Sequence, residues 1–176
     1  ISLSVNHAAR LQKYTPAWRI LEPAYLNLKK VPQLQLGEGE RLAVFACGCF
    51  WGAQHRFAAR KGVVRAVAGF AGDDAFGEPT YEDVRSRKSS HLESVAVVYD
   101  PLETDYLALC RYFFEIHDPG QTGGVGPDEG PQYQSAVFYC DDGQMQTARE
   151  VIDDLLSRGY AVETQLHRLG EFYPAA

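Results

Sequence analysis

Two cysteines stand in the segment with the clearest capacity for chemistry, Cys47-Gly48-Cys49-Phe50-Trp51-Gly52. This segment falls where an apolar stretch ends and a helical pattern begins. A cysteine at a helix start lies beside free backbone N–H groups and the positive end of the helix dipole, and both stabilise a thiolate. We therefore expect Cys49 to be a nucleophile, with Phe50 and Trp51 forming an aromatic wall suited to a methyl or thioether group. The alternative is a buried core thiol among ordinary core aromatics.

The second candidate is a carboxyl group on an apolar strand face. In the alternating segment from His91 to Tyr99, Glu93 shares one face with Val95 and Val97. Burial disfavours an ionised carboxylate, so we expect a raised pKa for Glu93 and a role as a general acid near neutral pH. A solvated glutamate at a strand edge is the alternative. If Glu93 and Cys49 lie close together, their protons titrate as a coupled pair.

A Gly- and Pro-rich segment, 119–131, is predicted to be a long loop with no structure of its own, and such loops commonly carry function. It differs from a phosphate-binding loop because it contains Asp128 and Glu129 and lacks a Lys-Ser/Thr ending. Tyr81 and Tyr133, from two separate segments, are candidate hydroxyl donors. Each tyrosine taken alone is also typical of a half-buried structural residue.

The elements that must position these residues follow from periodicity and from glycine and proline punctuation. Strands are predicted over 42–46, 63–70, 91–99, 135–139 and, as the last one, 161–166. Helices are predicted over 51–61, 104–117 and 142–158, with a short helical turn over 79–84 that begins at Pro79. This order predicts an α/β (α+β) fold: a ferredoxin-like split β-α-β core with a mixed sheet and helices packed on it.

Composition divides the chain into two parts. Residues 1–40 are mildly basic and carry three prolines, so we expect an irregular N-terminal arm packed on a catalytic domain of residues 41–176. The whole chain has 176 residues and a formal net charge of −6, which argues against nucleic acid as a partner. No apolar run reaches the roughly 18 residues of a membrane span.

Oligomeric state and location are less constrained by the sequence. We expect a monomer. Because the sequence begins at Ile1 and not at Met, the numbering starts inside a gene product, and a removed signal or transit segment would be invisible. The cytoplasm is the default expectation.

Taken together, these segments resemble the A-type peptide-methionine sulfoxide reductases, from Leu42 to about Tyr173. The resemblance rests on blocks that keep the family's order and spacing: Gly48–Gly52; Gly69–Gly72 with Pro79–Val84; His91-x-Glu93 with Val95 and Tyr99–Pro101; His117–Pro119 with Gln121, Gly126, Asp128, Gly130, Gln132, Tyr133 and Ser135; and Phe172–Ala175.

The resemblance implies a reaction in which the Cys49 thiolate attacks the sulfur of methionine sulfoxide while Glu93 protonates its oxygen. Tyr81 and Tyr133 would hydrogen-bond that oxygen as it gains charge. Methionine would leave, and Cys49 would remain as a sulfenic acid. The family acts on the S epimer, protein-bound or free, and requires no metal or organic cofactor. Three further residues would hold or orient the substrate: Phe50, Trp51 and Asp128.

Departures from the family pattern concentrate in the loop, where Gly123-Gly124-Val125 replaces the usual Asn-Arg-Gln and Gln134 replaces an arginine. They motivate an alternative in which the chain is a divergent member that has lost activity. Such a protein would bind methionine-like side chains or act as a thiol redox sensor.

Regeneration of the enzyme requires a second thiol. Cys47 is the candidate resolving residue, although side chains two apart on an extended strand lie too far apart for an easy disulfide. Cys110 is expected in the core and Cys140 at an exposed strand end. We expect recycling through Cys47 or directly by an external thiol reductant, thioredoxin among them.

Two other functions fit the residues less well. A zinc site would use Cys47 and Cys49, but Cys-x-Cys is not a typical zinc pair and no second close pair exists. A thiol hydrolase would use His55 or His91 to activate Cys49, and it would leave the aromatic pair and the acidic residue without roles.

Overall fold

The computed structural model of the chain describes residues 31–125 and 127–175. Most of the predicted arm, residues 1–30, lies outside the described residues. The part of it that is described contains a 3-10 turn, η3 (Pro32–Leu34), whose Leu34 is fully buried. Arg65 donates hydrogen bonds to the backbone carbonyls of Gln33 and Gln35. These contacts hold residues 31–36 against the sheet.

A six-stranded sheet runs through the protein in the order β7-β6-β1-β3-β2-β8. Its strands are β1 (Arg41–Ala46), β2 (Val63–Ala71), β3 (Leu92–Tyr99), β6 (Ala136–Tyr139), β7 (Gln165–Arg168) and β8 (Phe172–Pro174). All neighbours are antiparallel except β6 and β7, which are parallel, so the sheet is mixed. The helices are α3 (Phe50–Ala58), α4 (Tyr81–Arg85), α5 (Tyr106–Glu115) and α6 (Asp142–Ser157).

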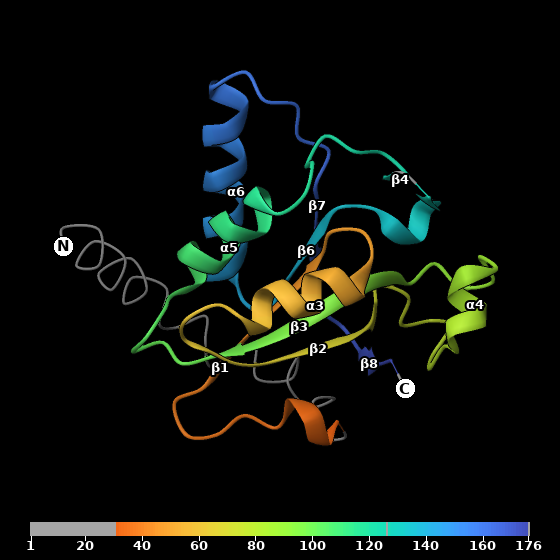
Figure 1. The fold of residues 1–176 in the computed structure, drawn as a ribbon, viewed down its shortest axis with the longest axis horizontal. Helices are drawn as coiled ribbons and strands as arrows, with labels where there is room; N and C mark the ends of the chain where they lie inside the picture. The colour runs from red at the N-terminus through yellow and green to blue at the C-terminus, as the bar shows by residue number, and fades with distance from the viewer. Residues whose placement is uncertain (1–30, 126, 176) are drawn as a thin grey trace.

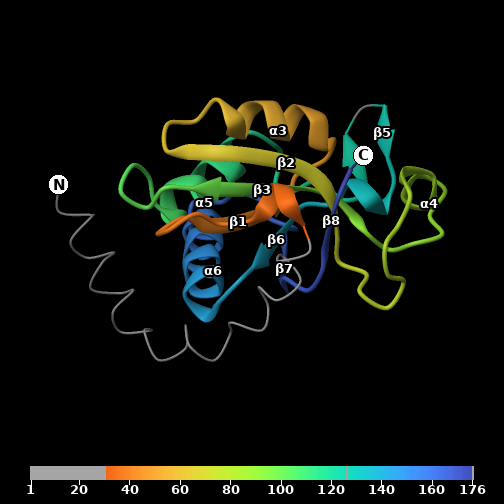
Figure 2. The same cartoon turned by 90° about the horizontal axis from the view of Figure 1, so that it is seen from below.

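The central four strands confirm the predicted core. Their order, β6-β1-β3-β2, and the crossovers through α3 and α5 are those of a ferredoxin-like split β-α-β unit. Three features lie at one end of this sheet in Figures 1 and 2: the start of α3, helix α4, and the hairpin of β4 (Gly124–Val125) and β5 (Asp128–Glu129). That end is where the predicted site residues come together.

Both faces of the sheet are buried, which explains why β1 and β3 are almost uninterrupted apolar runs. On the face covered by α3, α5 and α6, the ring of Phe45 stacks on Phe57 at 5.3 Å and on Phe113 at 4.9 Å between centroids. On the opposite face, Leu34 and Phe172 pack against side chains of β1, β3 and β6. The site is therefore held by a rigid, doubly covered sheet.

Helix starts are set by capping side chains. Pro79 precedes α4 but does not begin it, contrary to the prediction. Thr80 is the N-cap and forms a reciprocal capping box with Asp83. Asp105 and Asp141 cap α5 and α6, and each side chain accepts a hydrogen bond from a backbone N–H three residues later. None of the described helices has the length and apolar character needed to cross a membrane.

The prediction of a structureless loop over 119–131 is wrong in part. The segment contains a small hairpin, β4 (Gly124–Val125) paired with β5 (Asp128–Glu129). A 3-10 turn, η4 (Pro131–Tyr133), follows it. Strands of two residues are too short to leave a periodic signal, so the sequence shows only the glycines and prolines.

The predicted final strand, 161–166, is also misplaced, because β7 begins at Gln165 and β8 follows it. β7 is an exposed edge strand with polar residues on both faces, so it lacks apolar alternation. β8 pairs with β2 directly over Gly69, where an added Cβ would clash with the ring of Phe172 and the carbonyl of Tyr173. Gly69 is thus required for docking of the C-terminal strand.

Candidate active site

The turn between β1 and α3 presents Cys49 at the start of a helix. Gly48 has a φ of +96°, a conformation that residues with a side chain rarely adopt. Cys49 is the N-cap of α3, and its carbonyl accepts the first helical hydrogen bond from Ala53 at 3.4 Å. The half-buried thiol makes no capping bond to the helix. It is therefore left available for chemistry beside the helix N-terminus.

Glu93 meets this helix start from the neighbouring strand. Its Oε2 accepts a hydrogen bond of 3.2 Å from the backbone N–H of Phe50, the residue after Cys49. Only 3% of Glu93 is exposed, which excludes the solvated alternative. Burial raises the pKa of Glu93 to about 7, against the lowering effect of the Phe50 N–H and with a smaller contribution from the charge of Asp128. Near neutral pH, Glu93 is thus a proton donor next to the thiol.

Two tyrosines reach the same place from α4 and η4. Burial, and then the negative charges of Glu93 and Cys49, raise the pKa of Tyr81. Burial, followed by the charges of Glu93, Tyr81 and Asp128, raises the pKa of Tyr133. Both hydroxyls therefore stay protonated at neutral pH and can donate hydrogen bonds. The charges of Cys49, Glu93 and Asp128 reach these tyrosines, so the structure brings the five groups into one neighbourhood.

The aromatic residues of the site differ in exposure: Phe50 is buried, whereas Trp51 and Tyr81 are exposed. Phe50 is 1% exposed, and its ring lies 5.4 Å from the Phe70 ring and 6.3 Å from the Tyr81 ring. Trp51 packs on Phe50 at 4.7 Å between centroids but keeps 52% of its surface exposed. The predicted wall is therefore layered: Phe50 supports it, and Trp51 and Tyr81 present apolar surface to an incoming group.

Gln121 is a supporting residue that the sequence marks only as part of a motif. It is 8% exposed, and its Nε2 donates a 3.1 Å hydrogen bond to the carbonyl of Tyr133. The same nitrogen lies 3.8 Å from where a Cβ at Gly48 would be. Gln121 therefore packs between the nucleophile turn and the segment that carries Tyr133.

A second buried network fixes the base of the loop. The ring of His117 bonds the Phe113 carbonyl through Nδ1 at 2.6 Å and the Ser135 hydroxyl through Nε2 at 2.7 Å. Ser135 in turn bonds Thr164 at 2.8 Å. Burial lowers the pKa of His117 and favours the neutral ring, with Nδ1–H donating and Nε2 accepting. The network joins the end of α5 to the start of β6, between which the loop emerges.

The remaining cysteines differ in burial: Cys47 is half-buried, whereas Cys110 and Cys140 are buried. Cys47 packs against the core between the sheet and the helices, and burial raises its pKa to about 12. Cys110 is fully buried, as predicted. Cys140 is 1% exposed, so the expectation of an exposed thiol there is wrong: the strand end is covered, and its Sγ lies 3.7 Å from the Leu42 carbonyl. Within residues 31–125 and 127–175, no cysteine forms a disulfide and no three His, Cys, Asp or Glu side chains gather as a metal site.

Comparison with known proteins places this site in a family. Residues 41–176 match the sequence profile described as "Peptide methionine sulfoxide reductase". The chain is 40% identical over 142 residues to MsrA of Methanosarcina mazei, covering 79% of this chain and 67% of that relative. It is 43% identical over 143 residues to MsrA of Azotobacter vinelandii, covering 78% and 65%.

Solved structures give the same result. Methionine sulfoxide reductase A of Corynebacterium diphtheriae superposes with a TM-score of 0.71 at 33% identity, covering 79% of this chain and 71% of that one. The reduced form of Mxr1 from Saccharomyces cerevisiae superposes with a TM-score of 0.75 at 26% identity, covering 80% and 82%. The family expected from the motifs is confirmed: the chain belongs to the peptide methionine sulfoxide reductases.

Proposed function

We propose that the Cys49 site carries out the thiol-dependent reduction of methionine sulfoxide that defines this family of oxidoreductases. One observation carries the assignment of roles. The carboxyl group of Glu93 is held on the Phe50 N–H, directly beside Cys49, with its pKa raised to about 7. A nucleophile and a neutral acid are thus fixed at one helix start.

In the proposed step, the Cys49 thiolate attacks the sulfoxide sulfur as Glu93 gives a proton to the sulfoxide oxygen. The attack forms a bond between Cys49 Sγ and the substrate sulfur, and the sulfur–oxygen bond breaks as the protonated oxygen leaves as hydroxide. This hydroxide then attacks Cys49 Sγ, the bond between the two sulfurs breaks, and methionine departs with the electron pair, which leaves Cys49 as a sulfenic acid. The substrate sulfur gains two electrons and becomes the thioether of methionine, while the Cys49 sulfur loses two. Protonation matters because a bare oxide is a poor leaving group, and a general acid contributes about 10²–10⁴ in rate.

The surrounding side chains supply charge stabilisation and orientation. Tyr81 and Tyr133 donate hydrogen bonds to the sulfoxide oxygen as its negative charge grows. The exposed face of Trp51, supported by Phe50, holds the substrate methyl group. Asp128 orients the substrate from the hairpin. An oxygen bound on the tyrosine side and a methyl group bound on the tryptophan side would together select the S epimer.

Two routes can recycle the Cys49 sulfenic acid: attack by Cys47 and attack by an external thiol. The pKa of Cys47 near 12 leaves almost no thiolate at neutral pH, and only a thiolate attacks efficiently. We therefore favour an external dithiol of the thioredoxin class over Cys47. One solved neighbour, at 20% identity, is Mxr1 of Saccharomyces cerevisiae in complex with Trx2. Protein-bound and free methionine sulfoxide are both proposed as substrates.

The boundary of the catalytic unit is proposed at residue 41. The family profile begins there, and Arg41 is also the first residue of β1. We further propose that the protein acts as a monomer, which light scattering after gel filtration would test. No observation among the described residues favours the methionine-binding or redox-sensing alternative.

A single-turnover experiment tests the function. The reduced protein is incubated with separate S and R epimers of N-acetyl-methionine sulfoxide in the absence of other thiols, and the methionine formed per chain is counted. The proposal predicts about one methionine per chain from the S epimer and none from the R epimer. Cys47→Ser serves as the control and keeps this stoichiometry. No product from either epimer would contradict the proposed function.

A further inference from the structure

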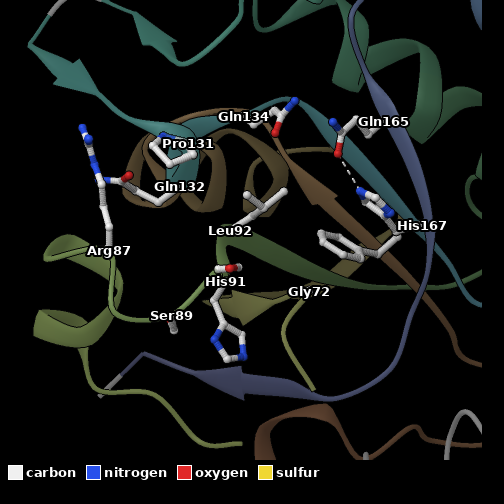
Figure 3. Close-up of a pocket in the computed structure, with 12 residues that line it drawn as sticks. Gly72, Arg87, Ser89, His91, Leu92, Pro131, Gln132, Gln134, Gln165 and His167 are labelled. Carbon is white, nitrogen blue, oxygen red and sulfur yellow. Dashed lines mark hydrogen bonds between the residues drawn. The ribbon is translucent and has the colours of Figure 1, made fainter. Parts of the chain in front are cut away.

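A cavity of about 330 Å³ lies beside the candidate active site but does not include Cys49. It is bounded by η4 on one side and by residues 87–92, which lead into β3, on the other (Figure 3). Leu92 and Phe138, which belong to the core on the face opposite α3, form its apolar floor. Glu93, the next residue along β3, faces the other side of the sheet. The cavity and the active site are therefore back to back across β3.

The polar lining of the cavity includes a cation but no carboxylate. Arg87 and Gln132 stand side by side at one end, and Gln165 and His167 stand at the other (Figure 3). His91 also borders the cavity, but its ring packs edge-on against Phe76 and Tyr173. This charge balance favours an anionic group on the occupant.

Four buried polar atoms of residues that line the cavity lack any partner within the described part of the chain: Ser89 Oγ, Gln132 Oε1 and the two ring nitrogens of His91. Ser89 and Gln132 are 7% and 6% exposed, and neither Ser89 Oγ nor Gln132 Oε1 makes a hydrogen bond. Leaving such atoms unpaired is unfavourable, because a buried polar group loses its hydrogen bonds to water. Gln132 Oε1 requires a donor, and Ser89 Oγ can either donate or accept. The occupant therefore needs a hydrogen-bond donor as well as an anionic acceptor.

Arg87 is the unusual residue of the cavity. Its φ of +62° is the one positive value among the described non-glycine residues, and side chains rarely adopt this conformation. The neighbouring cations are paired, Arg85 with Glu82 at 3.8 Å and Lys88 with Asp83 at 4.0 Å. The guanidinium of Arg87 makes no such ion pair with any described residue. The backbone conformation of Arg87 ends α4, because the N–H of Arg87 bonds the Val84 carbonyl and the N–H of the next residue bonds the Asp83 carbonyl, as in a left-handed helix C-cap. The turn places at the cavity mouth a cation that has no ion pair among the described residues.

A second, more open hollow extends the cavity. Its volume is about 590 Å³, and it shares Arg87, Pro131 and Gln134 with the first. Thr122 and Gly123 line its far side, where Glu129 is the one carboxylate. The two hollows adjoin at these shared residues, and we name them together the η4 groove. Two adjoining hollows can be filled by one chain that passes from the first into the second.

We propose that the η4 groove binds an extended polypeptide segment that carries an acidic side chain. The carboxylate accepts hydrogen bonds from Arg87, a backbone N–H donates to Gln132 Oε1, and a backbone carbonyl accepts from Ser89 Oγ. Because Leu92 and Glu93 face opposite sides of β3, a chain in this groove lies across the strand from Glu93, and it borders η4, which carries Tyr133. If the proposed function holds, the segment belongs to the polypeptide that carries the methionine sulfoxide.

The test uses peptides without methionine, so it does not depend on the proposed reaction. The probe is a fluorescein-labelled nonapeptide of glycine and serine with one central glutamate, and the control peptide has glutamine there. Fluorescence anisotropy at low ionic strength measures binding to the wild type, Arg87→Gln and Lys88→Gln. The two variants lose the same charge one residue apart, but only Arg87 lines the groove.

The proposal predicts that the glutamate peptide binds the wild type and Lys88→Gln about fivefold more tightly than the glutamine peptide, the scale of one charged contact. In Arg87→Gln this preference disappears. Equal binding of both peptides to the wild type, or a preference that survives in Arg87→Gln, would overturn the proposal. Free glutarate that binds more tightly than the glutamate peptide would overturn the assignment to a polypeptide.

Discussion

The middle of the sheet and its end at the start of α3 are built from the same strands, but the middle buries apolar side chains and the end buries a carboxyl group. In the middle, the β3 residues from Val95 to Tyr99 are buried among apolar side chains such as Phe45 and Phe57. At the end, the second residue of β3 is Glu93, which is 3% exposed and accepts a hydrogen bond from a backbone N–H of α3. Apolar packing therefore makes the middle of the sheet rigid. This rigidity holds the buried Glu93 carboxyl group, which is unfavourable by itself, in place.

The largest effect is expected at the nucleophile. Cys49→Ser should abolish methionine formation, by at least about 10⁴-fold, because an alcohol at neutral pH does not replace a thiolate. The variant should unfold at the same urea concentration as the wild type, since the thiol makes no capping bond. Single-turnover product analysis measures the loss. Residual activity within tenfold of the wild type would move the nucleophile elsewhere.

A smaller effect is expected at the tyrosine of η4. Tyr133→Phe removes one donor to the sulfoxide oxygen while Tyr81 keeps the other, so the single-turnover rate should fall by about 10–100-fold. Substrate affinity should change little, because the lost bond strengthens only as charge develops. Rapid-quench kinetics over a range of substrate concentration separates the two. A change confined to affinity would show that Tyr133 only binds substrate.

The smallest effect on rate is expected in the middle of the sheet. Phe57→Leu removes one partner from the Phe45 stack and should cost about 1–2 kcal/mol of unfolding free energy. The single-turnover rate of the folded variant should stay within threefold of the wild type. Urea denaturation and rapid-quench kinetics measure the two quantities. A large rate loss at unchanged stability would erase the distinction between the two regions.

The sequence predicts those features that depend on local patterns. The change from an apolar strand to a helical pattern at Gly48 locates Cys49, and alternation along β3 puts Glu93 on an apolar face. The predicted final strand, 161–166, overlaps β7 only at Gln165 and Leu166, because the polar residues of β7 give no clear alternation, and β8 is not predicted as a strand.

Features that arise from tertiary contact leave no local signal. Gln121 supports Tyr133 across twelve residues of chain, and nothing in its flanking sequence indicates the partner. The η4 groove forms between Arg87 and Gln132, which belong to segments far apart in the chain. Only the fold brings these residues together.

The central claim is that Glu93 is the acid that serves Cys49, and the pH dependence of the single-turnover rate tests it most directly. Since the Cys49 thiolate is needed in both the wild type and Glu93→Gln, a pKa of about 7 for Glu93 predicts that the ratio of the wild-type rate to the Glu93→Gln rate falls as pH rises through 7. Because the folded-state pKa exceeds the ordinary value of 4.5, stability is also lost between these pH values. Glu93→Gln should therefore be the more stable protein at pH 8, by up to about 3 kcal/mol, which excludes misfolding as the cause of its slower reaction.

We expect Glu93→Gln to react about 10²–10⁴-fold more slowly than the wild type at pH 6, and this difference to decline as pH rises through 7. A variant that keeps the wild-type rate, or a difference that stays constant as pH rises through 7, would contradict the assignment of Glu93 as the proton donor.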